Sequence, residues 1–162
     1  MKSVYLIGSI RNPLVVEVAA AMRDIGFDVF DDWHAAGPTA DDEWRKYENQ
    51  RGRSYVEALD GYAACHTYEY NMRHLKRCDM GVLVMPSGRL AHMEFGYMIG
   101  LGKKCYVLFD QPPECYGLMY KMASGVFFSF TDLARCIFPL ASNRLSAMAG
   151  VKDVENLTDS LG

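Results

Sequence analysis

The sequence predicts a single α/β domain built on a parallel β-sheet with helices on both faces. Short apolar runs predict buried strands, and the segments between them have helical character, which is the alternation typical of parallel sheets. The chain has 162 residues, half of them hydrophobic, so it is long enough to bury a core without disulfides. The sequence contains no internal repeat that would favour another architecture.

The first strand and helix are predicted from residues 4–26. Val4–Ile7 is an apolar run that ends in a Gly-Ser loop, as expected of a buried strand. Asn12 is a good helix cap, and Pro13 suits the first helical position. Apolar residues recur at positions 15, 18, 19, 22 and 25, and Gly26 ends the helix.

The next segments predict a strand and then a long helical region. Phe27–Phe30 is the second predicted strand, followed by the polar turn Asp31–Trp33. From Thr39 to about Lys76 the chain is helical in character, with one interruption around Gly52. Acids at positions 41, 42 and 43 fall in its first turn, where the helix dipole favours them.

The remaining elements complete the alternation. We predict a third strand over Met80–Met85, a helix over Ala91–Leu101 and a fourth strand over Lys104–Phe109. A fifth strand is predicted over Val126–Phe130, with Thr131-Asp132 opening a last helix. The composition then turns small and polar. We therefore expect one folded domain over residues 1–138, and a polar tail or loosely docked helix over residues 139–162.

Composition excludes several classes of function. The net charge of −3 gives no general attraction to a nucleic acid polymer or an anionic membrane. No apolar segment approaches the roughly 20 residues that span a bilayer, and the N-terminus lacks the features of a signal peptide. The spacings of the five cysteines and four histidines match no metal motif. We expect a cytoplasmic protein with no metal and no cofactor.

Three loops lie beyond the carboxyl ends of the predicted strands, where parallel sheets bind ligands. The loop from Gly8 offers close backbone approach, the hydroxyl of Ser9, the guanidinium of Arg11 and a helix N-terminus, which together suit an oxyanion. An ordinary strand-to-helix turn with an exposed arginine explains the same residues. Trp33, on the second loop, presents a flat face on which a base could stack.

The third loop leads to the most unusual residue of the chain. Ser87 and Gly88 supply a second set of anion donors, and Glu94 follows in the next helix among apolar neighbours. An acid near a helix start is favoured by the dipole by about 0.3–1 kcal/mol, which is a purely structural explanation. A partly buried carboxylate is costly, however, and such groups are often functional. Both interpretations of Glu94 remain open from these residues alone.

Two segments resemble a known family. Residues 4–11, Val-Tyr-Leu-Ile-Gly-Ser-Ile-Arg, resemble the N-terminal strand and loop of the deoxynucleoside 5′-monophosphate N-glycosidases. Residues 87–96 resemble the Ser…Glu-Leu-Gly segment which those enzymes share with nucleoside 2-deoxyribosyltransferases. The likeness extends from Met1 to about Phe130. It implies a flavodoxin-like domain with a five-stranded parallel sheet, and a homodimer or higher homo-oligomer.

The resemblance also implies a reaction. The glutamate that matches Glu94 attacks the anomeric carbon of a nucleoside or nucleotide and expels the base, as in retaining glycoside hydrolysis. Water then resolves the glycosyl-enzyme in a hydrolase, and a second base resolves it in a transferase. Tyr5 matches a tyrosine near the nucleophile. The positions matching Ser9, Arg11 and Ser87 surround the 5′ end of the sugar.

One position departs from the family pattern. An aspartate that serves near the leaving base is expected eight residues before Asp79, where this chain has Asn71. An amide cannot give up a proton as a carboxylic acid can. Natural tolerance, a shifted role for Glu69 or Asp79, or a sequence altered to slow turnover would each account for it.

Two alternative functions therefore stay open beside an N-glycosidase or deoxyribosyltransferase. Asn71 favours a catalytically silent nucleotide-binding or sensing module. An NAD-cleaving enzyme is the other alternative, because related folds also place a glutamate beside an N-glycosidic bond. The many apolar and aromatic residues within residues 39–76 predict an interface, and hence a homodimer.

Overall fold

The computed structural model describes residues 1–138, so the predicted tail over residues 139–162 lies outside the described residues. Residues 1–138 form a five-stranded, all-parallel sheet with the strand order β2-β1-β3-β4-β5. The strands are β1 (Ser3–Ile7), β2 (Asp28–Phe30), β3 (Met80–Val84), β4 (Lys104–Leu108) and β5 (Gly125–Phe127). This is the flavodoxin-like order, so the predicted fold class is confirmed.

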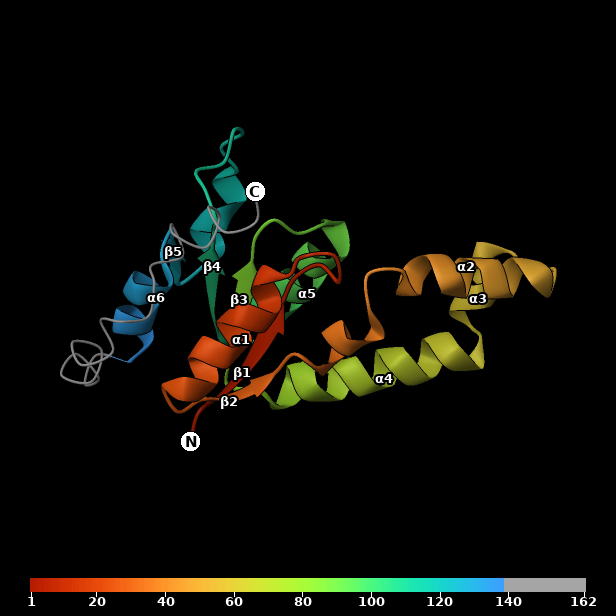
Figure 1. Ribbon diagram of the computed structural model, residues 1–162, viewed down its shortest axis with the longest axis horizontal. Helices are drawn as coiled ribbons and strands as arrows, with labels where there is room; N and C mark the ends of the chain where they lie inside the picture. The colour runs from red at the N-terminus through yellow and green to blue at the C-terminus, as the bar shows by residue number, and fades with distance from the viewer. Residues whose placement is uncertain (139–162) are drawn as a thin grey trace.

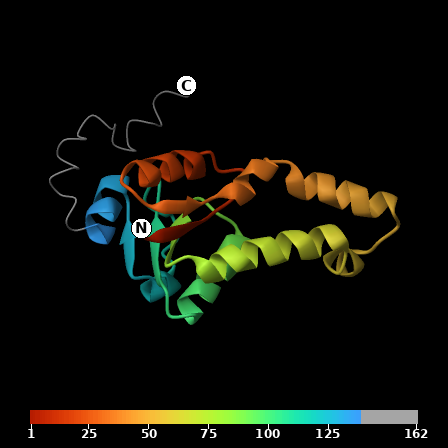
Figure 2. The same cartoon turned by 90° about the horizontal axis from the view of Figure 1, so that it is seen from below.

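Helices cover both faces of the sheet, as predicted (Figure 2). The α-helices are α1 (Leu14–Asp24), α2 (Ala40–Gln50), α3 (Tyr55–Leu59), α4 (Tyr62–Arg77), α5 (Arg89–Gly100) and α6 (Phe130–Ile137). Two 3₁₀ helices are η1 (Asp32–Ala36) and η2 (Leu118–Met122). One core cluster joins the sheet to α1 and α6, and the other joins it to α4 and α5.

The alternation of side chains along β1 explains how one strand serves both clusters. Val4 and Leu6 belong to the cluster that contains α1, whereas Tyr5 and Ile7 belong to the cluster that contains α4 and α5. Successive strand side chains point to opposite faces, and all four of these residues are fully buried. Tyr5 is thereby placed on the same face of the sheet as α5.

A helical arm, residues 40–77, projects sideways from the sheet (Figures 1 and 2). It consists of α2, α3 and α4, and both views show its outer part standing clear of the strands. The predicted break near Gly52 is present, and Gly52 has a φ of 70° that favours glycine. A second break at Asp60–Gly61 separates α3 from α4. The capping box of Ser54 and Glu57 begins α3.

Lys103 fastens the inner end of the arm. Its Nζ donates to the carbonyl oxygens of Leu75, Lys76 and Cys78 at the C-terminal end of α4. An ammonium group at that end of a helix satisfies free carbonyl groups and is favoured by the dipole. The last turn of α4 is therefore tied to the loop that precedes β4.

Several predicted boundaries were wrong by one to three residues. The last predicted strand stops at Phe127 rather than Phe130, and α6 begins at Phe130, because the hydroxyl of Ser129 accepts a bond from the backbone N–H of Asp132 at 3.2 Å and caps the helix. The helix that carries Glu94 starts at Arg89, two residues before the prediction. Among the described residues, no helix is long and apolar enough to cross a membrane.

Candidate functional site at the carboxyl edge of the sheet

Two loops meet where the strand order reverses, between β1 and β3. This topological switch point is where open α/β sheets bind ligands. The side-chain amide of Asn12 donates to the carbonyl oxygen of Pro86 at 3.2 Å and joins the two loops. Its Oδ1 accepts from the backbone N–H of Leu14 at 3.0 Å. Asn12 is 6% exposed, so a buried polar residue fixes the two loops relative to each other.

A pocket of about 320 Å³ opens between these loops. It is lined by Ser9, Arg11, Asn12, Pro13, Pro86, Ser87 and Gly88. Helix α5 begins next to Gly88, and no side chain caps its N-terminus, so backbone N–H donors remain available there. The structure thus brings together four of the predicted binding residues: Ser9, Arg11, Ser87 and Gly88.

Gly8, another predicted binding residue, has a packing role. A Cβ at Gly8 would lie 2.9 Å from Cγ2 of Val15 and 3.6 Å from the ring of Trp33. Any larger residue would force the first loop away from α1. The close packing of this loop is enough to explain why residue 8 is a glycine, and no bound ligand is needed for that explanation.

Glu94 lies on α5, more than one turn beyond the pocket. Its side chain is half-buried, and desolvation raises the pKa of its carboxyl group to about 7. Tyr5 is fully buried, and its hydroxyl has no hydrogen-bond partner among the described residues. Burial, and then the charge of Glu94, raise the pKa of Tyr5 far above its usual value. A neutral phenol with an unused donor therefore lies near a carboxyl group whose proton is held unusually tightly.

Asn71 is partly buried on α4, a helix that contacts both β1 and α5. The three elements that carry Tyr5, Asn71 and Glu94 therefore pack against one another. Asp79 lies elsewhere. It precedes β3 at the amino edge of the sheet, and its carboxylate accepts from the backbone N–H of Ser3 at 2.8 Å. Hydrogen bonds from Ser3 engage Asp79 at the amino edge, whereas α5, which carries Glu94, begins at the carboxyl edge, so the geometry does not favour Asp79 as a replacement for the missing acid.

Trp33 packs into the protein more deeply than its place in a polar turn indicates. Its indole N–H donates to the carbonyl oxygen of Leu6 at 2.9 Å, and its ring packs against both core clusters. The neighbouring His34 binds the carbonyl oxygen of Asn12 at 3.0 Å through Nε2. The loop after β2 therefore supports the loop after β1.

Sequence reasoning missed two acids that reach the site from the helical arm. Asp41 and Asp42 lie in the first turn of α2, and their carboxylates lie 3.8 and 3.5 Å from the guanidinium of Arg11. Arg45 also pairs with Asp42, at 3.1 Å. The acids were attributed to the helix dipole alone, and nothing in the sequence indicates a partner about thirty residues earlier.

A second missed contact involves His92 on α5. Its Nδ1 lies 2.8 Å from the carbonyl oxygen of Gly88, and its Nε2 lies 2.9 Å from the hydroxyl of Tyr120. The carbonyl can only accept, so Nδ1 carries a proton and donates it to Gly88. His92 therefore joins η2 to the start of α5.

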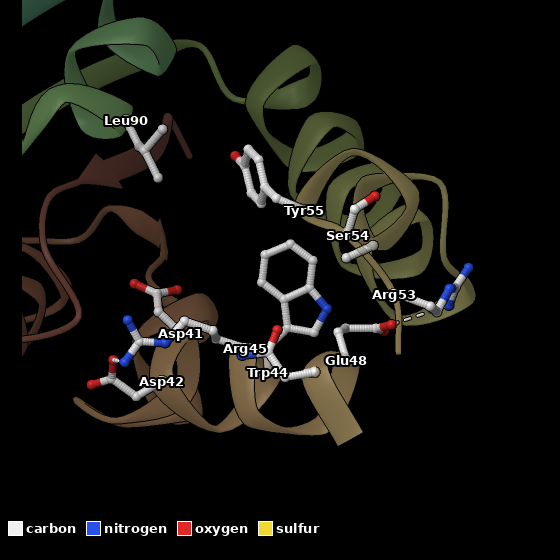
Figure 3. A pocket seen from close by; sticks show the side chains of 11 residues that line it. Asp41, Asp42, Trp44, Arg45, Glu48, Arg53, Ser54, Tyr55 and Leu90 are labelled. Atoms are coloured by element: carbon white, nitrogen blue, oxygen red, sulfur yellow. Dashed lines mark hydrogen bonds and ion pairs between the residues drawn. The ribbon is translucent and has the colours of Figure 1, made fainter. Parts of the chain in front are cut away.

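A larger cavity, of about 490 Å³, lies between the helical arm and the start of α5 (Figure 3). Trp44 and Tyr55 form an aromatic wall with ring centroids 6.4 Å apart, and Leu90 faces them from α5. Glu48, 3% exposed, pairs with Arg53 at 3.2 Å. Asp41 and Asp42 also line this cavity, so their pairs with Arg11 separate it from the pocket at the switch point.

Comparison with known proteins finds a likeness to a solved structure. No family model matches the chain, and no curated protein matches it. A solved structure of a 2-deoxyribosyltransferase from Bacillus psychrosaccharolyticus matches with a TM-score of 0.54 and 19% sequence identity, over 81% of this chain and 89% of that chain. That enzyme is described as a biocatalyst for the synthesis of antiviral and antitumoral nucleosides. This chain therefore has the fold of a 2-deoxyribosyltransferase.

Proposed function

We propose that the protein cleaves the N-glycosidic bond of a 2′-deoxynucleoside or its 5′-monophosphate, by hydrolysis or by transfer to another base. The observation that carries this proposal is Glu94, a half-buried carboxyl group with a pKa raised to about 7, near the buried hydroxyl of Tyr5. Groups perturbed in this way gather at functional sites. The shared fold with a 2-deoxyribosyltransferase supports the same chemistry.

The proposed reaction has two steps. A carboxylate oxygen of Glu94 attacks C1′ of the sugar, the C1′–N bond breaks, and its electron pair leaves with the base, which takes a proton from water. Water or a nitrogen of a second base then attacks C1′ and loses a proton, and the carboxylate of Glu94 leaves. Tyr5 donates a hydrogen bond that orients the carboxylate, and Ser9 and Ser87 hold the 5′ end of the sugar.

Replacement of the nucleophile tests the proposal. The protein is incubated with a panel of deoxynucleosides, their 5′-monophosphates and NAD, and the release of free base is measured by chromatography. We expect release from a deoxynucleoside or its monophosphate, and Glu94→Ala to abolish it. The control is Met93→Ala, which truncates the adjacent side chain, 70% exposed on the same helix. Unchanged release by Glu94→Ala would overturn the assignment, and release from NAD alone would identify an NAD-cleaving enzyme.

Hydrolysis and transfer are separated by adding a second free base. A transferase yields a new nucleoside that contains the added base, whereas a hydrolase yields free deoxyribose or its 5-phosphate. Mass spectrometry of the reaction mixture distinguishes these products directly.

Asn71 favours a second candidate function, a catalytically silent nucleotide-binding module. Under this reading the switch-point pocket binds a nucleotide, and the site lacks an acid for the leaving base. Calorimetry that detects tight binding, without base release even after Asn71→Asp, would support the binding module over the enzyme. Base release that increases in Asn71→Asp would favour the enzyme.

We also propose that two copies of the chain associate through the helical arm. Large apolar side chains are exposed along α3 and the start of α4: Tyr55 at 69%, Val56 at 70%, Leu59 at 46% and Tyr62 at 86%. Contiguous exposure of this kind marks interaction surfaces. Light scattering at micromolar concentration measures the mass, and a monomeric mass would contradict the proposal.

A further inference from the structure

The pocket at the switch point holds one charged side chain among its described lining residues, that of Arg11. This guanidinium pairs with two carboxylates, those of Asp41 and Asp42. We propose that Asp41 and Asp42 make the site select an uncharged 5′-hydroxyl group over a 5′-phosphate. The inference rests on the proposed function, and it assigns to the helical arm a specificity-determining role at the sugar's 5′ end.

The charges around Arg11 explain the selection. A 5′-phosphate carries about −1.5 to −2 charges at neutral pH and needs an excess of positive charge. Arg11 and Arg45 supply two positive charges, and Asp41 and Asp42 already offset them, so no excess of positive charge remains. The other donors of the pocket are the hydroxyls of Ser9 and Ser87 and the N-terminus of α5, and they bind a hydroxyl as well as a phosphate. A phosphate beside Arg11 would also approach two carboxylates of like charge.

Glu43, the third acid of the same helical turn, does not pair with Arg11, so only Asp41 and Asp42 of the three add negative charge at the site. Glu43 pairs with Lys46 at 3.0 Å, one turn further along α2. Asp41 and Asp42 instead reach back to Arg11, on the loop after β1. Arg45 lies 3.1 Å from Asp42 on the same helix and holds that carboxylate in place. Two of three adjacent acids thus contribute charge to the switch point, and the third does not.

The expected size of the effect is moderate. The side chains of Arg11, Asp41 and Asp42 are 54%, 63% and 45% exposed, so water and salt weaken their interactions. Exposed charge pairs are individually weak, and we expect two of them acting on one phosphate to change its affinity by about tenfold. The effect should decrease as salt concentration rises.

The test compares one nucleoside with its own monophosphate. Values of kcat/KM for base release from deoxyadenosine and deoxyadenosine 5′-monophosphate are measured for the natural protein and for the double variant Asp41→Asn/Asp42→Asn. We expect the natural protein to prefer the nucleoside, and the double variant to raise the monophosphate-to-nucleoside ratio about tenfold at low salt. Glu43→Gln is the matched control, since it removes a negative charge from the same turn and should leave the ratio unchanged.

Each contrary result has a distinct meaning. A lower ratio in the double variant would show that the acids orient Arg11 to bind phosphate, which overturns the proposal. An unchanged ratio, or an equal increase in Glu43→Gln, also overturns it. If no compound of the deoxynucleoside panel releases its base, the proposed function fails, and calorimetric titration with deoxyadenosine and its monophosphate tests the selection. A monophosphate-to-nucleoside affinity ratio that does not rise in the double variant then overturns it.

Discussion

The helical arm and the edge of the sheet each contain an acidic side chain that is at least partly buried, Glu48 and Glu94. The two differ in whether a cation lies beside the carboxyl group. Glu48, in the helical arm, is 3% exposed and lies 3.2 Å from the guanidinium of Arg53. Glu94, at the edge of the sheet, is half-buried, and within residues 1–138 no cation lies at ion-pair distance from it. The better buried acid is therefore the one whose charge is compensated.

This difference is the one expected between a structural acid and a reactive acid. A buried carboxylate with a partner stabilises its surroundings as long as both charges remain. A carboxylate that is desolvated without a partner keeps its proton more tightly and, once ionised, has little to hold it in place. The uncompensated carboxyl group of Glu94 suits a nucleophile, whereas the compensated carboxylate of Glu48 suits a structural role in the arm.

The largest expected effect on stability comes from breaking the compensated pair. Glu48→Ala leaves the charge of Arg53 without its partner, and we expect a loss of about 3 kcal/mol in the free energy of unfolding. Hydrogen exchange should locate the loss in the helical arm, with the central strands still protected. Arg45→Ala breaks an exposed pair on the same arm and is the control, with an expected loss below about 0.5 kcal/mol. Equal losses of unfolding free energy in the two variants would show that the Glu48–Arg53 pair contributes no more than an exposed pair.

Glu94→Gln should stabilise the protein, by a smaller amount and only at higher pH. The pKa of Glu94 is raised from 4.5 to about 7. Its ionisation therefore costs folding free energy fully above pH 7, in part between pH 4.5 and 7, and not below. The variant lacks this cost, so we expect roughly 2–3 kcal/mol of added stability at pH 8 and none at pH 4. Urea unfolding at the two pH values measures it, and an equal change at both would contradict the raised pKa.

The same raised pKa predicts how the proposed activity depends on pH. Glu94 must be ionised to attack the sugar, so base release should fall about tenfold for each pH unit below 7 and level off above it. Rates measured from pH 5 to 9 with a deoxynucleoside, which has no phosphate to titrate, test this directly. A rate that stays constant from pH 5 to 7 would argue against Glu94 as the nucleophile.

The regions of the molecule differ in how far the sequence predicts them. The five strands and the helix carrying Glu94 were predicted because runs of apolar residues indicate segments that are buried in the core. Their ends were less certain, since a single capping hydroxyl, that of Ser129, decides where α6 begins. Glu94 itself stood out because its neighbours in the sequence are apolar, and a helix that packs on a sheet must bury part of such a segment.

Contacts between distant segments could not be predicted in this way. Glu48 stands between Tyr47 and Asn49 in a polar helix, and nothing local indicates its burial. The pairing of Asp41 and Asp42 with Arg11 depends on how the arm leaves the sheet. Trp33 was assigned to the ligand from its place in a polar turn, whereas its hydrogen bond to Leu6 places much of its ring against the core.

Lys103 holds only the C-terminal end of α4, so a change in the tilt of this helix would move its other end the most. Helix α4 has 16 residues, so its far end lies about 24 Å from the end that Lys103 holds. A tilt of about 10° at the held end would carry the far end through about 4 Å, more than the length of a hydrogen bond. The aromatic wall of the large cavity and the two acids that face Arg11 belong to the helices joined to that far end. A rotation of α4 about the end that Lys103 holds would therefore displace the outer part of the arm further than its inner part.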